Sequence, residues 1–334
     1  MVRNGIIAAG TWLVDLIKFI PSFPVEGNLV SIDKEVVGFG GCAHNVIMDL
    51  ARMKSGLPLY AAGCIGKDSY GDLILNVIEQ LGINTDFMEQ VDEFPTSYTD
   101  VMVARNKATR TFFHNKGANS IFGVDLVLRI DVPAKIFHLG YLLLLDRLEE
   151  PDDIYGLKAA RAFADLRQRG YETSLDVVSE ESDRFQKIIF PCLKYINYLV
   201  INEIEAGACC GVPLRDCNGE IRMEGVRKAA SDLMALGINT LCCIHFPEGG
   251  YALSNTGEEC FCPSYRIPSE QIVSTVGAGD AFCAGILYAA HENMALEKML
   301  QFANASAYFN LLHETSCDGA PNLEEIKRFI NMKC

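Results

Sequence analysis

The sequence predicts an α/β protein, namely a three-layer sandwich with a mainly parallel central sheet and a small β-sheet lid. Three observations support this prediction. Short apolar runs alternate with amphipathic segments along the whole chain, as in parallel sheets that helices cover on both faces. Two stretches, 17–37 and 91–115, instead alternate like strands and have no helix after them. The 334 residues, 49% of them hydrophobic, are enough for a sizeable core.

The individual elements follow from hydrophobic periodicity. Short buried strands are expected at 5–10, 59–65, 135–139, 173–177, 198–201 and 240–245. Amphipathic helices are expected at 45–53, 72–81, 154–169, 224–236, 280–290, 296–312 and 323–332. Gly82 and Gly170 directly follow two of these helices, where glycine commonly ends a helix.

The two inserted stretches predict a lid. Residues 101–105 and 110–114 flank the hairpin signal Asn106-Lys107-Ala108-Thr109. We therefore expect a large domain over 1–16, 38–90 and 116–334, and an inserted β lid over 17–37 and 91–115. A flap over the carboxyl ends of parallel strands lies where ligands bind in such sheets.

Composition and charge exclude several classes of partner. The formal net charge of −14 argues against nucleic acid and anionic membranes. No run approaches about 18 apolar residues, so we expect no membrane span. The first segment is interrupted by Asp15 and Lys18 and lacks a signal-peptide core, which favours a cytoplasmic protein.

The thirteen cysteines are scattered, and no Cys/His cluster has the sequence spacing of a zinc site. The pairs Cys209-Cys210 and Cys242-Cys243 are adjacent in the chain. The one CxC pattern, with a single residue between two cysteines, is Cys260-Phe261-Cys262. Reduced thiols in a cytoplasmic protein are therefore favoured over a metal or disulfide framework.

The stretch from Ser274 to Phe282 is the most informative one. Gly277, Ala278 and Gly279 are small enough for their amides to surround an oxyanion at the start of the following helix. Asp280 would lie in the first turn, where its carboxylate could take a proton from an attacking hydroxyl. The alternative is an ordinary glycine-rich loop capped by an aspartate.

Two further groups have both a binding and a structural interpretation. Asn202 and Glu205 follow a buried strand and could hold water around Mg²⁺, or they could form a helix capping box. Gly40 and Gly41 open a helix that contains Asn45, and they permit either a close ligand approach or only a tight turn. Asp15, just after the first strand, is either a hydroxyl-binding carboxylate or an exposed loop acid.

Several motifs together resemble the ribokinase-like carbohydrate kinases, the PfkB family, over essentially the whole chain. Gly277-Ala278-Gly279-Asp280 resembles the family's C-terminal signature, and Gly40-Gly41 with Asn45 resembles its N-terminal one. The NxxE motif of the family is matched by Asn202 and Glu205. Two further characteristic turns are matched by Gly63, Gly66, Asp68 and Gly71, and by Gly117-Ala118-Asn119.

The resemblance implies ATP-dependent phosphorylation of a sugar hydroxyl and a ribokinase-like fold. Asp280 would be the base, and the Gly277–Gly279 amides would form the anion hole. The other implied roles are sugar binding by Asp15, Gly40, Gly41 and Asn45, nucleotide binding by Asn202, Glu205, Thr275 and Asn304, and organisation of Mg²⁺ through water by Glu205. It also implies a homodimer that pairs through the lids.

This chain departs from the family pattern in ways that bear on its ligands. Ser274 stands where relatives usually have Asp in a loop that helps bind a monovalent cation, so K⁺ activation is in doubt. Cys42 replaces the Lys common in ribokinases, so ribose is not assured as the substrate. Phe246-Pro247-Glu248-Gly249-Gly250 also differs from relatives near the expected nucleotide contacts.

The sequence permits more than one class of acceptor: a free sugar, a phosphosugar or a nucleoside. Arg105, Lys107 and Arg110 could bind the phosphate of a phosphosugar, but solvated edge charges are the favoured interpretation. We therefore expect a free sugar such as a ketohexose or pentose. A nucleoside kinase is the alternative, with Phe112, Phe113 and Tyr141 available for stacking. A non-catalytic sugar- or nucleotide-binding member of the fold is the third possibility.

Overall fold

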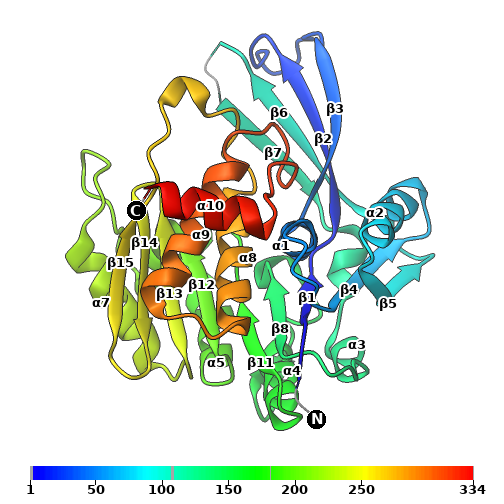
Figure 1. Ribbon diagram of the computed structural model, residues 1–334. Helices are drawn as coiled ribbons and strands as arrows, with labels where there is room; N and C mark the ends of the chain where they lie inside the picture. The colour runs from blue at the N-terminus through cyan, green and yellow to red at the C-terminus, as the bar shows by residue number, and fades with distance from the viewer. Residues whose placement is uncertain (1–2, 107–108, 181, 334) are drawn as a thin grey trace.

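The computed structural model describes residues 3–106, 109–180 and 182–333. Its main feature in these residues is a nine-stranded sheet with the order β15-β14-β13-β12-β11-β8-β1-β4-β5 (Figure 1). These strands are β1 Ile6–Gly10, β4 Leu59–Gly66, β5 Asn84–Val91, β8 Ile136–Gly140, β11 Glu172–Leu175, β12 Tyr198–Asn202, β13 Leu241–Phe246, β14 Gly249–Ser254 and β15 Glu259–Pro263. Within this sheet, β5, β4, β1, β8, β11, β12 and β13 are parallel to one another. β14 pairs antiparallel with both β13 and β15.

Helices cover both faces of this sheet, which confirms the predicted three layers. Successive residues of β1 alternate between the two cores, with Ile6 and Ala8 in one and Ile7 and Ala9 in the other. The first core is covered by α1 Cys42–Arg52, α2 Ser69–Gln80, α8 Ala278–His291, α9 Leu296–Asn310 and α10 Leu323–Lys333. The second is covered by α3 Val124–Leu128, α4 Lys158–Gln168, α5 Phe185–Leu193, α6 Glu203–Cys210 and α7 Met223–Ala235.

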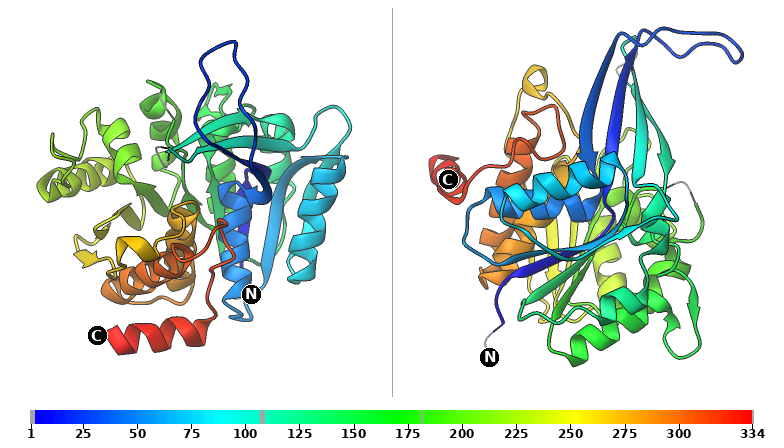
Figure 2. Two further views of the ribbon diagram at one scale, coloured as in Figure 1. Left: turned by 90° about the horizontal axis from the view of Figure 1, so that it is seen from above. Right: turned by 90° about the vertical axis from the view of Figure 1, so that its right-hand side faces the viewer.

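A separate four-stranded sheet forms the lid, with the order β3-β2-β6-β7. It consists of β2 Leu13–Ile20, β3 Lys34–Gly40, β6 Ser97–Ala104 and β7 Thr109–Asn115. The lid projects beyond the large sheet on the side of the carboxyl ends of the parallel strands (Figure 2). The lid strands are less buried than the strands of the large sheet. Most residues of β3 and β7 are partly or fully exposed, whereas all five residues of β1 are buried.

The lid begins and ends at different residues than predicted. β2 starts at Leu13, so residues 13–16 belong to the lid sheet, and β3 continues to Gly40. In the second stretch, Val91 ends β5 of the large sheet, and the lid resumes at Ser97. Periodicity alone does not show these limits, because the chain passes from one sheet to the other within a few residues. The predicted turn at 106–109 includes residues 107–108, which lie outside the described residues.

Most predicted elements of the large domain lie within a few residues of their expected limits. Three helices differ most in where they begin. α1 begins at Cys42 rather than at 45, directly after Gly41, and α2 begins at Ser69 rather than at 72. α4 begins at Lys158 rather than at 154, because β9 Pro151–Asp152 and β10 Gly156–Leu157 form a small antiparallel pair before it. Three short 3₁₀ helices complete the fold, η1 Gly117–Ile121, η2 Leu142–Leu144 and η3 Ser269–Gln271. Among the described helices, none has the length and apolar character needed to cross a membrane.

Candidate active site

A cavity of about 860 Å³ lies between the lid and the carboxyl-end edge of the large sheet. Its walls come from β2 and β7 of the lid, from the start of α1, and from the segment that leads into α8. The cavity brings together most of the site residues that the sequence predicted. Those that line it are Asp15, Gly40, Gly41, Asn45, Asn202, Glu205, Thr275, Gly277, Gly279 and Asp280.

Asp280 lies in the first turn of α8 and is 4% exposed. The side-chain amide of Asn45 donates to Asp280 Oδ2 over 2.7 Å, and Asn45 Oδ1 accepts from Ser316 Oγ over 2.8 Å. Burial raises the pKa of Asp280 above its usual value, and hydrogen bonds from Asn45, Cys42 and Tyr141 oppose this rise. A raised pKa and a fixed orientation are properties of a general base.

The Gly277–Gly279 turn has the backbone conformation that an anion site requires. Gly277 has φ +79°, and a Cβ there would lie 2.1 Å from the carbonyl oxygen of Ser316. The amide of Ala278 makes a long contact of 3.4 Å to the carbonyl of Thr275. Within the described residues, the amides of Gly277 and Gly279 have no hydrogen-bond partner. These two amides and the N-terminal dipole of α8 are available to a negatively charged group.

The glycines before α1 make room for two neighbours. Gly41 has φ +92°, and its missing Cβ would lie 2.4 Å from the carbonyl oxygen of Thr11. A Cβ on Gly40 would lie 2.5 Å from Asp15 Oδ2. Asp15 is located inside β2 of the lid, opposite Gly38 and Thr99, and not at the end of the first strand in the large domain, where the sequence placed it. Burial, and then the charge of Asp280, raise the pKa of Asp15 to about 6.

Asn202 and Glu205 form the capping box that the sequence left as an alternative. Asn202 Oδ1 accepts from the amides of Ile204 and Glu205 over 2.9 Å each, and Glu205 Oε2 accepts from the amide of Asn202 over 2.9 Å. Both residues also line the cavity, so capping and ligand binding are compatible. Burial raises the pKa of Glu205 to about 7.

Within the described part of the chain, four carboxylates of the cavity have no ion-pair partner, and Arg110, which also lines the cavity, bonds to Ser274 instead. The four are Asp15, Asp176, Glu205 and Asp280, and burial raises the pKa of each. Negative groups in this arrangement fit a divalent cation that also carries phosphate oxygens. The donor set is therefore suited to Mg²⁺.

Two predicted nucleotide-binding residues lie in different places. Thr275 is exposed and lines the cavity. Asn304, in α9, is buried and does not line it; its side-chain amide donates to the carbonyl of Cys262 over 3.0 Å and to that of Pro263 over 3.3 Å. Asn304 thus holds the end of β15 against α9.

Some residues at the cavity were not singled out as site residues by the sequence. Arg110 lines it, and its guanidinium donates to Ser274 Oγ over 3.2 Å, which differs from the favoured interpretation of a solvated edge charge. Arg105 fits that interpretation, because it pairs with Asp33 over 3.4 Å, while Lys107 lies outside the described residues. Asp176 follows β11 directly, and a carboxylate after a buried strand is a signal that could have identified it.

Comparisons with known proteins agree with the resemblance. A family model described as pfkB family carbohydrate kinase matches residues 4–323. The chain belongs to this family. A ribokinase of Arabidopsis thaliana is 27% identical over 304 residues, which cover 90% of this chain and 74% of the relative. A ribokinase of Haemophilus influenzae is 25% identical over 331 residues, which cover 98% and 99% of the two chains. An adenosine kinase of Schizosaccharomyces pombe is 25% identical over 269 residues, covering 77% of this chain and 75% of the relative.

The fold agrees with the same family. The solved structure of Arabidopsis thaliana ribokinase complexed with ribose and ATP has a TM-score of 0.80 to this chain at 22% identity, and it covers 98% of this chain and 99% of that one. This pfkB family member is thus a ribokinase-like protein and a phosphotransferase that acts on an alcohol group. Its relatives include kinases of sugars and of nucleosides, so the family alone leaves the acceptor open.

Proposed function

We propose that this pfkB family member transfers the γ-phosphoryl group of ATP to a hydroxyl of a small free sugar, a ketohexose or a pentose. The observation that carries the proposal is the position of Asp280. Its buried carboxylate lies at the N-terminus of α8, 2.7 Å from the side-chain amide of Asn45, on the wall of a cavity of about 860 Å³. One edge of that cavity therefore combines a base with a positively polarised helix end.

Asp280 accepts the proton of the attacking hydroxyl in this proposal. Its raised pKa increases the basicity of the carboxylate, and the bond from Asn45 restricts its orientation. Asn45 is in turn held by Ser316 Oγ at 2.8 Å. Catalysis then rests mainly on positioning, because phosphoryl transfer asks for little covalent chemistry from the protein.

The turn before α8 stabilises the transferring group. Gly277 and Gly279 line the cavity with amides that have no partner in the described residues, and Ala278 lies between them at the start of the helix. Charge that develops on the phosphoryl oxygens is stabilised by such preorganised donors. ATP would extend from there past Thr275 and Asn202. Asn304 would support the adenine end of the site indirectly, because its side-chain amide donates to the carbonyl of Cys262 and so fixes β15.

Mg²⁺ would be held through water by Glu205 and Asn202, whose side chains face the cavity. When bound, the ion neutralises charge on the nucleotide phosphates. The capping bonds of both residues keep their side chains fixed for this purpose. Binding of K⁺ at Ser274 is less well supported than binding of Mg²⁺. The uncharged Ser274 Oγ already accepts hydrogen bonds from Arg110 and from the amide of Val276, each over 3.2 Å.

The sugar would bind between the lid and the start of α1. Asp15 and Asn45 supply polar atoms for its hydroxyls, and Gly40 and Gly41 let the ring approach the backbone. The lid strand β7 adds Phe112, which is 57% exposed at the edge of the cavity. Closure of this sheet over the sugar would exclude water from the γ-phosphate.

A nucleoside kinase is the second candidate. It is favoured by the exposed aromatic ring of Phe112 on the cavity wall and by the 25% identity to an adenosine kinase. In that case Phe112 would stack on the base. The non-catalytic binding protein that the sequence left open is disfavoured, because the chain belongs to a family of kinases and has a buried carboxylate at the start of α8.

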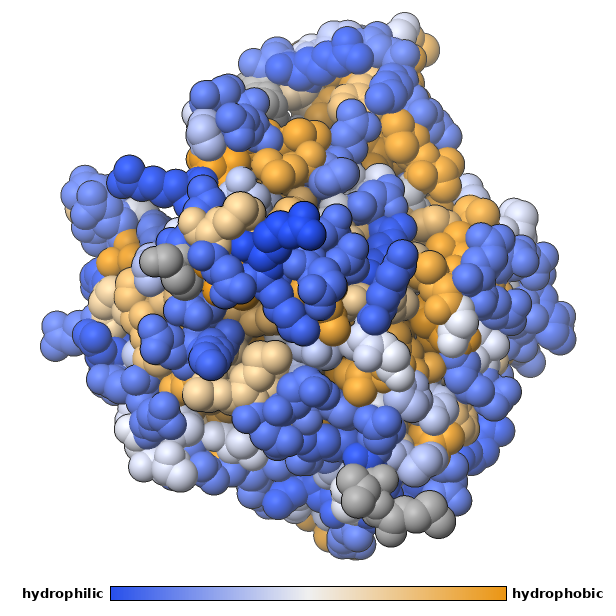
Figure 3. All heavy atoms as spheres, in the orientation of Figure 1, coloured by the Kyte–Doolittle hydropathy of each residue, from blue (hydrophilic) through white to orange (hydrophobic). Residues whose placement is uncertain are grey.

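We also propose that the protein forms a homodimer through the lid. The segment between β2 and β3 exposes Phe23, Val25, Leu29 and Ile32, at 45%, 75%, 90% and 49%. Hydrophobic atoms appear among hydrophilic ones over the lid at the top of the molecule (Figure 3). Sedimentation of the wild type and of Leu29→Glu tests this, and a monomeric wild type would contradict it.

The acceptor is identified by measuring ADP release from ATP and Mg²⁺ across free sugars, phosphosugars and nucleosides, with and without K⁺. We expect a clear response to one free ketohexose or pentose and little dependence on K⁺. A response confined to nucleosides would establish the second candidate. ATP binding without ADP release from any acceptor would favour the non-catalytic alternative.

A further inference from the structure

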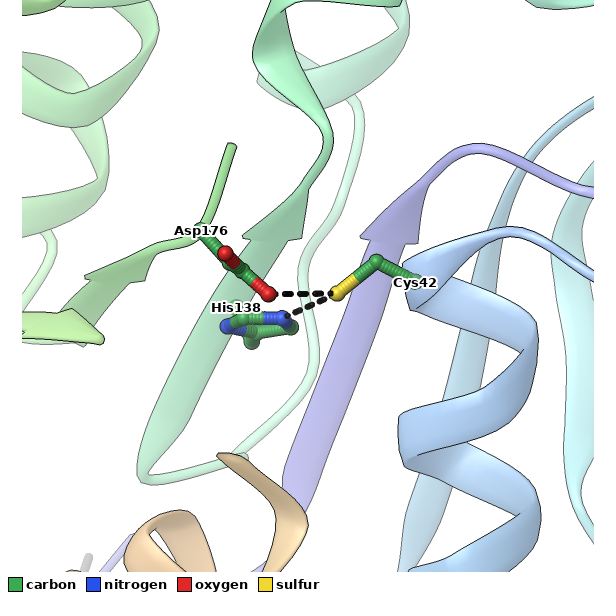
Figure 4. Close-up of side chains that lie close together, drawn as sticks. All are labelled: Cys42, His138 and Asp176. Atoms are coloured by element: carbon green, nitrogen blue, oxygen red, sulfur yellow. Dashed lines mark hydrogen bonds between the residues drawn. The ribbon is translucent and has the colours of Figure 1, made fainter. Parts of the chain in front are cut away.

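A cluster of metal-ligand side chains lies directly beneath the cavity wall, next to Asp280. It contains Cys42 at the start of α1, His138 in the middle of β8 and Asp176 after β11 (Figure 4). One ligand atom from each lies within 4.8 Å of the other two, and all three residues are buried. These residues are far apart in the sequence, which explains why spacing along the chain gave no sign of a metal site.

Two distances from Cys42 lie at or just below the spacing that the ligands of a tetrahedral metal ion would have. Cys42 Sγ lies 3.3 Å from His138 Nε2 and 3.2 Å from Asp176 Oδ2. Metal–ligand bonds of about 2.0 to 2.3 Å at tetrahedral angles place neighbouring ligand atoms about 3.3 to 3.8 Å apart. A second thiol is near, since Cys283 Sγ lies 3.9 Å from the same His138 Nε2.

The surroundings of the cluster orient its ligands. His138 Nδ1 lies 3.0 Å from Ser174 Oγ, so the imidazole can donate there and direct the lone pair of Nε2 to the thiols. Room for the Cys42 side chain comes from Gly140, where a Cβ would lie 2.7 Å from Sγ.

We propose that Cys42, His138, Asp176 and Cys283 bind one Zn²⁺ ion as a structural site. Sulfur, imidazole and carboxylate ligands together favour zinc over Mg²⁺, which prefers oxygen ligands alone. Binding releases the two thiol protons to solvent. Entry is available from the cavity, because Asp176 lines it.

The ion would join the two elements that carry the reactive groups. Cys42 is the first residue of α1, directly after Gly40 and Gly41, and Cys283 lies one helical turn after Asp280 in α8. β8 and β11 supply the other two ligands from the sheet below. The site therefore fixes α1 and α8 relative to each other and acts on Asp280 by positioning.

The test is zinc binding to the full chain. Protein stripped with a chelator is mixed with Zn²⁺, separated by gel filtration and analysed for metal, and affinity is measured by competition with a chromophoric chelator. We expect one equivalent in the wild type and a loss of affinity on the order of 100-fold or more in Cys42→Ser and His138→Gln. Cys192→Ser is the matched control, because Cys192 is equally buried but lies in α5, and it should bind as the wild type does.

A second measurement does not depend on the folding of variants. Co²⁺ added to the stripped wild type should give the intense visible absorption of a tetrahedral site and a thiolate charge-transfer band at one equivalent. The proposal is overturned if the wild type retains no zinc, if Cys42→Ser retains as much as Cys192→Ser, or if Co²⁺ gives only the weak absorption of an octahedral ion. Unchanged affinity in Cys283→Ser would remove Cys283 from the ligand set.

Discussion

The two walls of the cavity differ in how firmly their side chains are held. On the wall formed by α1 and α8, Asp280 and Asn45 are 4% and 3% exposed and bond to each other at 2.7 Å. On the lid wall, Asp15 and Arg110 are only partly buried, and Phe112 is 57% exposed. The rigid wall is suited to chemistry, which requires fixed geometry, and the lid wall is suited to binding and release.

The sharpest test of this difference is a pair of isosteric changes on opposite walls. Asp280→Asn should lower kcat by about 10³-fold or more, because it removes the base while the buried fold around it stays intact. Asp15→Asn should leave kcat within a few-fold and raise KM for the acceptor by about tenfold. Steady-state kinetics measures both, with ATP affinity as the control for folding. Equal effects on kcat would remove the distinction between the walls.

The turn before α8 can be tested with two neighbouring glycines. Gly277→Ala places a Cβ 2.1 Å from the carbonyl oxygen of Ser316 at φ +79°, so it should lower the free energy of unfolding by more than about 1 kcal/mol and strongly reduce turnover. In Gly279→Ala the new Cβ would contact only the ring of His245, at 3.1 Å. This variant should therefore lose less stability and less turnover than Gly277→Ala. Denaturant unfolding and turnover measure the two effects. A more severe Gly279→Ala would contradict the assigned roles.

On the lid wall, Arg110 provides the next test. Arg110→Ala removes a half-buried guanidinium that faces the cavity and Ser274, and it should lower kcat/KM by about tenfold. Arg105→Ala is the matched control, since Arg105 pairs with Asp33 and does not line the cavity. Equal kcat/KM values for the two variants would contradict a functional role for Arg110.

The smallest expected effect is a pH dependence of acceptor binding. The pKa of Asp15 is raised to about 6 by burial and then by Asp280, so its carboxylate gains charge as the pH rises through 6. The apparent KM for the acceptor should therefore rise as the pH falls through 6 and level off near the value of Asp15→Asn, at most about tenfold higher. This part of the profile should be flat in Asp15→Asn. A wild-type KM that does not change between pH 5 and 7 would contradict the role of Asp15.

The rigid wall is also the part of the site that the sequence predicted best. Gly277, Gly279 and Asp280 lie together in a local motif, so neighbours in sequence are neighbours in space. The same holds for the capping box of Asn202 and Glu205. The inner strands of the large sheet were predictable because burial on both faces produces apolar runs, as in β1 and β8. The sequence did not predict β5, β14 and β15, which lie toward the two edges of the sheet and are less buried or antiparallel.

The lid wall and the cluster of Cys42, His138 and Asp176 were harder to predict for a physical reason. Asp15 appeared to lie at the end of the first strand because β1 and β2 are separated only by Thr11 and Trp12, although they belong to different sheets. The role of Arg110 depends on how β7 pairs with β6, which the sequence does not specify. Cys42 and His138 are 96 residues apart, and only the folded sheet brings them to 3.3 Å.

The measurement that tests the central claim most directly is the stoichiometry of phosphoryl transfer. Wild-type protein with ATP, Mg²⁺ and the acceptor found in the panel should yield ADP and phosphorylated acceptor in equal amounts, with little ADP when the acceptor is omitted. Asp280→Asn should bind ATP and form neither product at a comparable rate. Equal product formation by Asp280→Asn, or ADP release that does not depend on the acceptor, would contradict the account.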